Sequence, residues 1–228
     1  MLEDVLLGFC YFRPRKGYMQ GMSYVASVLV RTHGDAEIAL RVLVRMTDSI
    51  LPLYWGTDLD AFLADCRVMA ILMRDTLPAV AARLEAETIE PTYFLPQWFL
   101  TLFDVVLPHD VLLVFWDLLL IDGKLALYRA ATALLSIASK AILGKRRGDI
   151  TAILTVLKNF DGLKPAKFAA AYRKMSRVVT PGRIEDTEED AREAEAARLK
   201  AAAEKTPTTV VNVESPYGPP PPMVPLAD

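Results

Sequence analysis

The residue with the clearest chemical potential is a glutamine that stands between two glycines. The segment runs Lys16-Gly-Tyr-Met-Gln-Gly-Met22, and Gln20 lies where an apolar, helix-forming stretch begins. Gly21 frees the neighbouring backbone, so the Gln20 amide can point outward from a rigid support. A carboxamide donates and accepts hydrogen bonds, and can therefore hold a water and a phosphate oxygen together. Gln20 is thus a candidate catalytic residue, although a simple hydrogen bond near a helix start would also account for it.

Motifs of enzymes that act on their own substrate are absent from the sequence. There is no G-x-x-x-x-G-K-[ST] loop, no HExxH and no EF-hand pattern. The segment Gly21-Met-Ser-Tyr-Val25 departs from a nucleophile elbow at its last position. The two histidines and two cysteines are far apart in sequence, so we expect no metal site. Cys10 and Cys66 are predicted to be two buried thiols rather than a disulfide framework, and no nucleic-acid partner is predicted.

Three segments match the motifs of one family in the same order. The first is Gly17-Tyr-Met-Gln-Gly-Met-Ser23, against G-Y-x-Q-G-M-N, and the second is Gln97-Trp-Phe-Leu-Thr-Leu-Phe103, against W-F-L-T-L-F. The third is Val114-Phe-Trp-Asp-Leu-Leu-Leu-Ile-Asp-Gly123, against R-V-W-D-x-L-L-x-x-G. Over residues 1–178 the chain therefore resembles the TBC-domain family, the Rab GTPase-activating proteins. The resemblance implies an all-α, multi-helix fold.

The resemblance also implies that the chain activates GTP hydrolysis by another protein. In this family the glutamine of Y-x-Q, here Gln20, orients the attacking water, and an upstream arginine neutralises charge on the β/γ oxygens. GTP hydrolysis depends mainly on such positioning and electrostatics. The partner GTPase carries GTP and Mg²⁺, so we expect no cofactor in this chain. The partner-binding residues expected on the same loop are Gly17, Tyr18, Gly21 and Met22.

The family's arginine motif, I-x-x-D-x-x-R, does not precede the glutamine. Arg13, Arg15 and Lys16 lie nearby but outside such a motif, so the arginine role is not transferred to them. An arginine finger contributes about 10³–10⁵ in rate, and we therefore expect weak activity. Ser23 replaces the family's usual Asn and Val114 its usual Arg, which predicts weaker hydrogen bonding and the loss of an ion pair. These features predict an N-terminally incomplete domain.

Gly and Pro punctuation divides the first 178 residues into helices, and no period-2 strand pattern occurs. The first helix starts without a cap and presents one apolar face: Leu2, Val5, Leu6 and Phe9. Gly34 is placed to end the second helix and Asp35 to cap the third. The later helices are expected over residues 20–31, 36–49, 57–76, 78–87, 92–106, 110–121, 124–143, 149–158 and 166–178.

The helices expected between residues 92 and 143 are apolar nearly all round, which predicts a central place in the fold. Their aromatic residues are predicted to be core: Trp98, Phe99, Phe103, Phe115 and Trp116. Asp117, in the same stretch, needs a partner if it is buried. Prolines and charged residues interrupt the most apolar window, Tyr93–Ile121, so no transmembrane helix is predicted.

Charge is unevenly distributed along the chain. Residues 1–182 hold 21 Lys and Arg against 18 Asp and Glu, whereas residues 183–228 hold 5 against 10. The stretch Lys140–Arg177 is the basic part of the body and includes Arg146 and Arg147. Such a stretch could contact an anionic membrane, or it could be the solvated faces of the last helices.

The sequence changes character after residue 178. Residues 1–178 are predicted to form the partial TBC domain, 179–205 a charged linker or solvated helix, and 206–228 a disordered, proline-rich tail. Pro219, Pro222 and Pro225 have PxxP spacing, which is an SH3-ligand hypothesis beside that of a plain disordered terminus.

Two classes of function follow from this sequence. The first is a Rab GTPase-activating protein in vesicle trafficking, and the alternative is a non-catalytic module that binds a small GTPase or scaffolds other proteins. A membrane-surface adaptor that uses residues 140–177 is a third, weaker hypothesis. The start, Met-Leu-Glu-Asp-Val-Leu-Leu, is not a secretory signal, and we expect a cytoplasmic protein with peripheral endomembrane contact as a further option.

Overall fold

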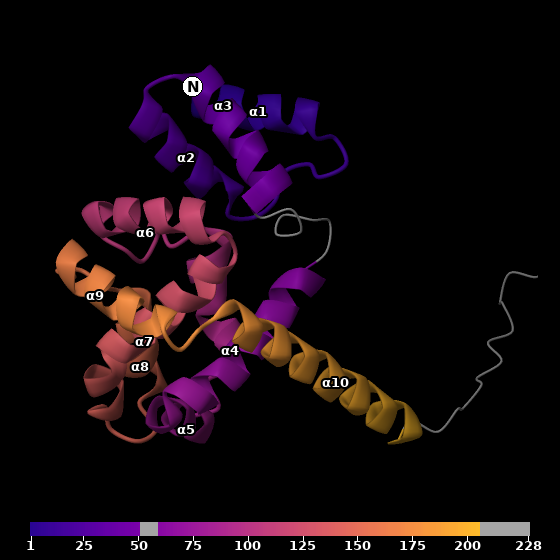
Figure 1. Ribbon diagram of the computed structural model, residues 1–228, viewed down its shortest axis with the longest axis vertical. Helices are drawn as coiled ribbons and strands as arrows, with labels where there is room; N and C mark the ends of the chain where they lie inside the picture. Colours follow the sequence, from indigo (N-terminus) through magenta and orange to yellow (C-terminus); the bar gives the residue numbers. More distant parts are fainter. Residues whose placement is uncertain (51–58, 206–228) are drawn as a thin grey trace, which may run out of the picture. The chain divides into compact units, whose positions relative to one another are not determined.

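The computed structural model describes residues 1–50 and 59–205, and every regular element in those ranges is a helix (Figure 1). The predicted all-α fold is therefore confirmed. Contacts divide the chain into one compact unit, Met1–Glu193, and a second unit, Ala194–Asp228. The start of the helix expected over residues 57–76 and the tail over 206–228 lie outside the described residues.

The N-terminal helices pack against one another: α1 Leu2–Phe12, α2 Met22–His33, α3 Ala36–Arg45 and the π-helical turn η1 Met46–Ile50 (Figure 1). α1 buries Val5 and Phe9, and α2 and α3 cover this face. Gly34 ends α2 with a left-handed φ of 65°. Asp35 caps α3 because its side chain accepts a hydrogen bond of 2.9 Å from the Ile38 N–H. Both predicted helix-end signals are confirmed.

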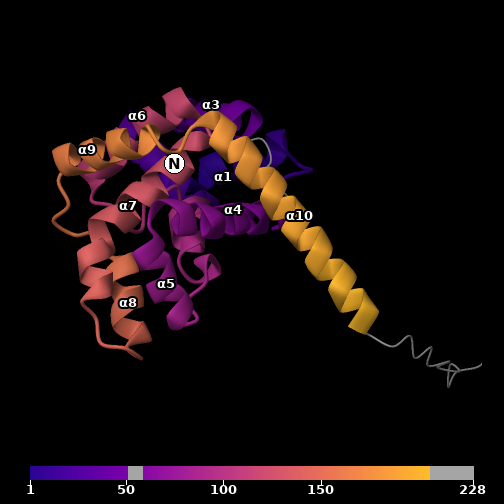
Figure 2. The same ribbon diagram turned by 60° about the horizontal axis from the view of Figure 1, so that its bottom comes forward.

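Among the remaining helices, α7 (Leu125–Leu143) is the central one. They are α4 Asp60–Thr76, α5 Pro78–Ala86, the short turns η2 Pro91–Tyr93 and η3 Pro96–Leu100, α6 His109–Asp122, α7 Leu125–Leu143, α8 Ile150–Lys158, α9 Pro165–Ser176 and α10 Pro181–Lys205. α7 contacts α4, α5, α6, α8 and α9, and α8 and α9 lie beside it in both views (Figures 1 and 2). The predicted break at Leu77-Pro78 is confirmed.

By length and composition, α7 could cross a membrane, and it is the one such helix among residues 1–50 and 59–205. Its most apolar window is 61% buried inside the protein. Central helices of folded domains meet the same criteria, so α7 is weak support for a membrane span.

The segment 92–106 is not the single helix that its apolar pattern predicts. Two short turns, η2 and η3, are followed by irregular backbone in which Leu102 and Phe103 have left-handed φ values of 46° and 66°. Strained backbone of this kind persists only where its surroundings over-determine it. Here the Trp116 indole N–H donates to the Leu102 carbonyl at 3.2 Å, and the Trp98 indole N–H donates to the Leu157 carbonyl at 2.9 Å. Tertiary packing has overridden the helical pattern.

All five aromatic residues that were predicted to be core are buried: Trp98, Phe99, Phe103, Phe115 and Trp116. Asp117 is exposed, so it needs no buried partner. Cys66 is buried, and burial raises the pKa of its thiol to about 12. Cys10 is only half-buried, and the prediction of two buried thiols is wrong for it.

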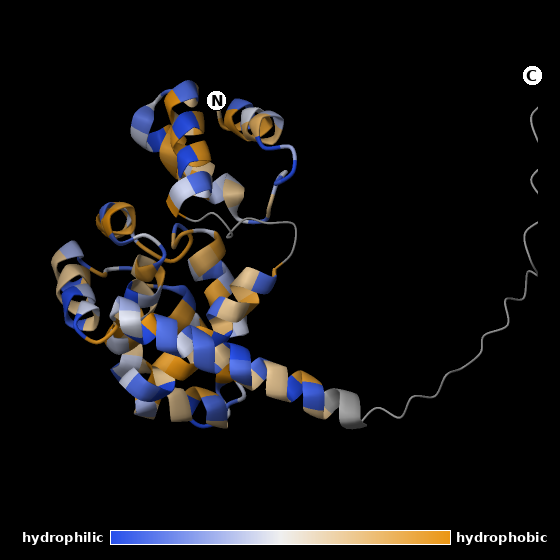
Figure 3. Ribbon diagram, turned by 45° about the vertical axis from the view of Figure 1, so that its right-hand side comes forward, coloured by the Kyte–Doolittle hydropathy of each residue, from blue (hydrophilic) through white to orange (hydrophobic). Residues whose placement is uncertain are grey.

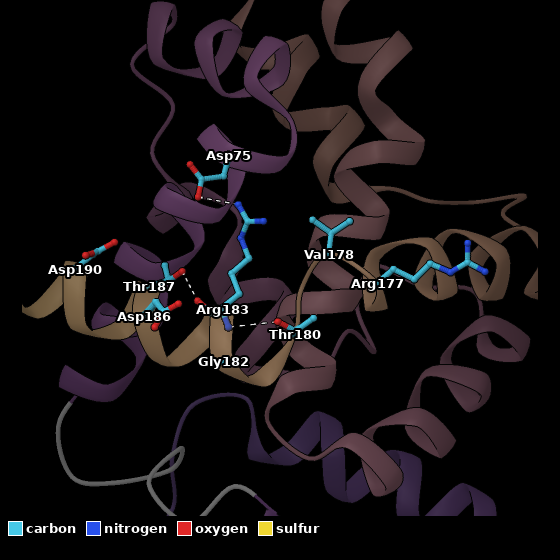
Figure 4. Close-up of a pocket in the computed structure, with 9 residues that line it drawn as sticks. All are labelled: Asp75, Arg177, Val178, Thr180, Gly182, Arg183, Asp186, Thr187 and Asp190. Carbon is cyan, nitrogen blue, oxygen red and sulfur yellow. Dashed lines mark hydrogen bonds and ion pairs between the residues drawn. The ribbon is translucent and has the colours of Figure 1, made fainter.

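The first part of α10 packs against the rest of the compact unit. Ile184, Thr187 and Ala191 are buried on one of its faces. Arg183 pairs with Asp75 at 3.0 Å (Figure 4). Figure 3 shows many hydrophilic residues along this helix, as its composition suggests. The boundary predicted at residue 178 thus falls inside the compact unit, which extends to Glu193.

Candidate functional site

Gln20 is exposed in the turn that immediately precedes α2. Gly21 follows it with a φ of 97° and is buried. A Cβ atom at Gly21 would lie 2.2 Å from the backbone oxygen of Leu100, closer than any real contact, so only glycine fits. The backbone beside Gln20 therefore rests directly on the end of η3. This arrangement offers the Gln20 carboxamide to solvent from a fixed main chain.

The four residues expected to bind a partner occupy two kinds of position. Tyr18 is 55% exposed, and its hydroxyl donates to the Ser23 hydroxyl at 3.3 Å. Gly17 is half-buried, with a left-handed φ of 62°. Gly21 and Met22 are buried, and they support the loop from within the fold. Of the four, only Tyr18 presents a large exposed side chain.

Two cations of the loop before Gln20 are tied to η1. The Arg13 Nε donates to Asp48 Oδ1 at 3.1 Å, and a second guanidinium nitrogen contacts Oδ2. The Lys16 Nζ donates to the Thr47 carbonyl at 2.8 Å and lies 3.6 Å from Asp48 Oδ1. The Arg13 guanidinium holds the pKa of Asp48 below its ordinary value. Arg13 is therefore engaged within its own chain rather than presented to a partner.

Arg15 differs from its neighbours. It is exposed, and it forms no hydrogen bond or ion pair with any of the residues that the structure describes. Its place in the turn follows from the Arg13 carbonyl, which accepts the backbone N–H groups of Lys16 at 2.9 Å and Gly17 at 3.0 Å. Arg15 is thus the loop cation that remains available.

The three sequence motifs touch one another in the fold. The glutamine segment meets the second motif where Gly21 contacts Leu100. The second motif meets the third where Trp116 donates to the Leu102 carbonyl. A further ion pair joins Arg31 of α2 to Asp104 at 2.9 Å, just beyond the second motif. The aromatic core is therefore connected to the backbone that carries Gln20. The contacts of Asp48 lie outside all three motifs, so the sequence motifs did not predict them.

The groove drawn in Figure 4 lies elsewhere, at the start of α10. Its volume is about 740 Å³, and its lining includes Asp75, Arg177, Arg183, Asp186 and Asp190. No residue of the glutamine loop lines it. Across residues 1–50 and 59–205, no group of three His, Cys, Asp or Glu side chains could hold a metal ion.

The chain is similar in sequence to known proteins over more than half of its length. The sequence model of the Rab-GTPase-TBC domain matches residues 1–143. Carabin from Mus musculus is 36% identical over 137 residues, which are 60% of this chain and 31% of that protein. Growth hormone-regulated TBC protein 1 from Xenopus laevis is 31% identical over 145 residues, 64% of this chain and 42% of that protein.

The fold also matches a solved structure. The crystal structure of the Chlamydomonas flagellar RabGAP TBC domain superimposes with a TM-score of 0.65 at 23% identity, and the match covers 74% of this chain and 57% of that one. The chain spans 31–42% of the length of the two curated relatives above. The family model covers more than half of the chain and includes all three motifs. The chain belongs to the Rab-GTPase-TBC domain family.

Proposed function

We propose that this chain is a GTPase-activating domain for Rab-type small GTPases and that Gln20 acts in trans on the partner's GTP. The observation that carries the proposal is the exposed Gln20, held on a backbone that Gly21 seats against Leu100. The Gln20 amide would accept a hydrogen bond from the attacking water and donate one to a γ-phosphate oxygen. Water then adds to the γ-phosphorus while the bond between the γ-phosphorus and the β-γ bridging oxygen breaks. GDP and phosphate are released.

The partner GTPase supplies GTP and Mg²⁺ in this proposal. The chain's own part is positioning, because the Gln20 carboxamide holds the attacking water in one orientation through a fixed hydrogen-bond donor and acceptor. Arg13 is paired with Asp48, so it does not serve as an arginine finger. Full activation of a GTPase raises its rate about 10⁵-fold, and an arginine finger contributes about 10³–10⁵ of that factor. Without such a finger we expect this chain to raise the rate by at most about 10²-fold.

The test is single-turnover GTP hydrolysis across a panel of Rab proteins, with the parent chain and with Gln20→Ala. We expect weak stimulation by the parent, and a return to the intrinsic rate of the GTPase with Gln20→Ala. The chain's other glutamine, Gln97, is also exposed, and Gln97→Ala is the matched control. Strong stimulation that Gln20→Ala leaves intact would sink this proposal.

The alternative proposal is a non-catalytic module that binds a GTPase or scaffolds other proteins. The pairing of Arg13 with Asp48 favours it, because it keeps the Arg13 guanidinium from reaching a partner's nucleotide. In that case GTP-dependent binding to a Rab would persist without any stimulation of hydrolysis. Binding of an SH3 domain at Pro219, Pro222 and Pro225 stays a prediction, since those residues lie outside the described ranges.

Cytoplasmic location with peripheral membrane contact is part of the same proposal. Four cations are exposed at α9 and its C-terminal end: Lys167, Arg173, Lys174 and Arg177. The opposite face of α9 buries Phe168, Tyr172 and Met175. A helix with one buried apolar face and one basic face could lie against anionic headgroups while it stays folded into the domain.

A further inference from the structure

The loop that carries Gln20 has two anchored ends. At its C-terminal end, Gly21 is seated against Leu100, as described above. At its N-terminal end, Asp48 and the Thr47 carbonyl hold Arg13 and Lys16. Between these anchors the chain has no regular secondary structure apart from the turn at residues 14–16. A loop of this kind samples many conformations unless contacts restrict it.

The N-terminal anchor comes from η1, a π-helical turn of the kind often found at functional sites. Thr47 is buried, and its hydroxyl donates to the Val44 carbonyl at 2.8 Å, which fixes the turn. The adjacent Asp48 carboxylate binds Arg13 through both of its oxygens, a geometry that restricts direction as well as distance. Through these contacts η1 restrains a loop that lies 35 residues away in sequence.

We infer that Asp48 is a positioning residue for Gln20. Its carboxylate holds Arg13 and Lys16 and thereby restricts the loop in the conformation that presents the Gln20 carboxamide. The inference rests on the proposed function, because it assigns Asp48 a role through Gln20. A displacement of about 1 Å in a reacting group can cost about 10²-fold in rate, so such a restraint has a measurable effect.

The ion pair between Arg13 and Asp48 is partly exposed, so it can be removed to test its effect on the loop without unfolding the domain. The side chains of Arg13 and Asp48 are 35% and 33% exposed. Exposed pairs contribute little to global stability. Asp48→Asn should therefore release the loop and leave the domain folded. Asp48→Glu keeps the charge and can still reach Arg13.

The experiment measures hydrogen exchange over residues 13–20, single-turnover GTP hydrolysis and the unfolding midpoint for each variant. For Asp48→Asn we expect amide exchange in the loop to rise by about tenfold or more, while exchange in α7 stays unchanged. The rate at saturating domain concentration should fall toward that of Gln20→Ala. The half-saturating concentration should change less, because partner contacts elsewhere are retained.

Three further variants sharpen the result. Arg13→Ala should reproduce Asp48→Asn, and the double variant should add little to either, as expected for two members of one contact. Asp48→Glu should restore most of the loop protection and rate. Glu37→Gln is the matched control, since Glu37 forms an exposed ion pair with Arg41 on α3. It removes the same charge and should change neither loop exchange nor rate.

Two results would overturn the inference. One is loop exchange in Asp48→Asn equal to that of the parent chain. The other is a loosened loop with an unchanged rate, which would mean that the restraint does not position Gln20. Failure of the proposed function gives a different result, because Gln20→Ala would then leave the hydrolysis rate unchanged. A role for Asp48 that acts through Gln20 would then fail as well. Loop exchange would still show whether Asp48 orders the segment.

Discussion

Gly21 is the residue on which the placement of Gln20 depends most directly. Its left-handed φ of 97° disfavours any side chain, and its backbone contact with Leu100 leaves no space for one. Both constraints exclude a Cβ atom at position 21. The sequence pattern predicted the need for a glycine beside the glutamine, because a freed backbone was required there. It could not reveal Leu100 as the neighbour, since that contact depends on how η3 packs.

We expect Gly21→Ala to destabilise the domain by about 2 kcal/mol or more, because backbone strain and a steric clash add together. Urea unfolding monitored by circular dichroism measures the loss. Gly34→Ala is the matched control, since Gly34 also has a left-handed φ, 65°, but has open space around its Cβ position. Strain alone should cost Gly34→Ala about 1 kcal/mol. Equal losses in the two variants would contradict the clash with Leu100.

Asp48 shows what sequence reasoning misses at the residue scale. The loop cations Arg13 and Lys16 were recognised as a basic cluster close to the glutamine. Their acidic partner is distant in sequence, on a different element, and no local pattern marks it. A single acidic residue after an amphipathic helix looks like ordinary solvated surface. Only the packing of α1 against α3 brings the two together.

Among the secondary-structure elements, helix ends were predicted best, and the segment around η3 worst. Gly34, Asp35 and the Leu77-Pro78 break act through local chemistry, so the sequence suffices to place them. The η3 region depends instead on indole hydrogen bonds to the carbonyls of Leu102 and Leu157. A continuous apolar pattern carries no sign of those long-range contacts.

The basic face of α9 allows a test of the membrane proposal at the level of one element. Replacing both Lys167 and Lys174 with Gln should weaken binding to phosphatidylserine-containing vesicles by about tenfold or more, since each lysine near an anionic surface contributes about 1 kcal/mol. Vesicle co-sedimentation at low salt measures this. The control replaces two exposed arginines of α3, Arg41 and Arg45, with Gln. Equal weakening in both variants, or no binding by the parent chain, would count against a membrane-facing α9.

On the scale of the whole molecule, the compact unit extends beyond the part that the family model matches. That model covers residues 1–143, whereas α8, α9 and the start of α10 add buried residues to the same unit. Composition predicted a charged linker or solvated helix after residue 178, because hydrophilic residues outnumber apolar ones there. The few apolar positions on the buried face are too sparse to form a visible stripe.

Ending the chain after residue 178 should therefore lower its stability. The truncation removes the burial of Ile184 and Ala191 and the ion pairs of Arg183 with Asp75 and of Glu188 with Lys124. Burial of one large aliphatic side chain contributes about 1.5–3 kcal/mol, so we expect a loss of about 2–4 kcal/mol. Thermal unfolding measures it. A chain that ends after residue 205 keeps α10 and should lose much less, and an equal loss would contradict a structural role for this helix.

The anchors of the glutamine loop have a consequence for how such a domain can diverge. Two of its contacts use main-chain oxygens, those of Leu100 and Thr47, which every amino acid supplies. Substitutions at these two positions can thus leave the anchors in place, provided that the backbone keeps its path. The side chains of Arg15 and Tyr18 are exposed on the same loop and take no part in either of these two contacts. If the proposed function holds, these two side chains are where the domain can change its choice of GTPase while the anchors keep Gln20 in position.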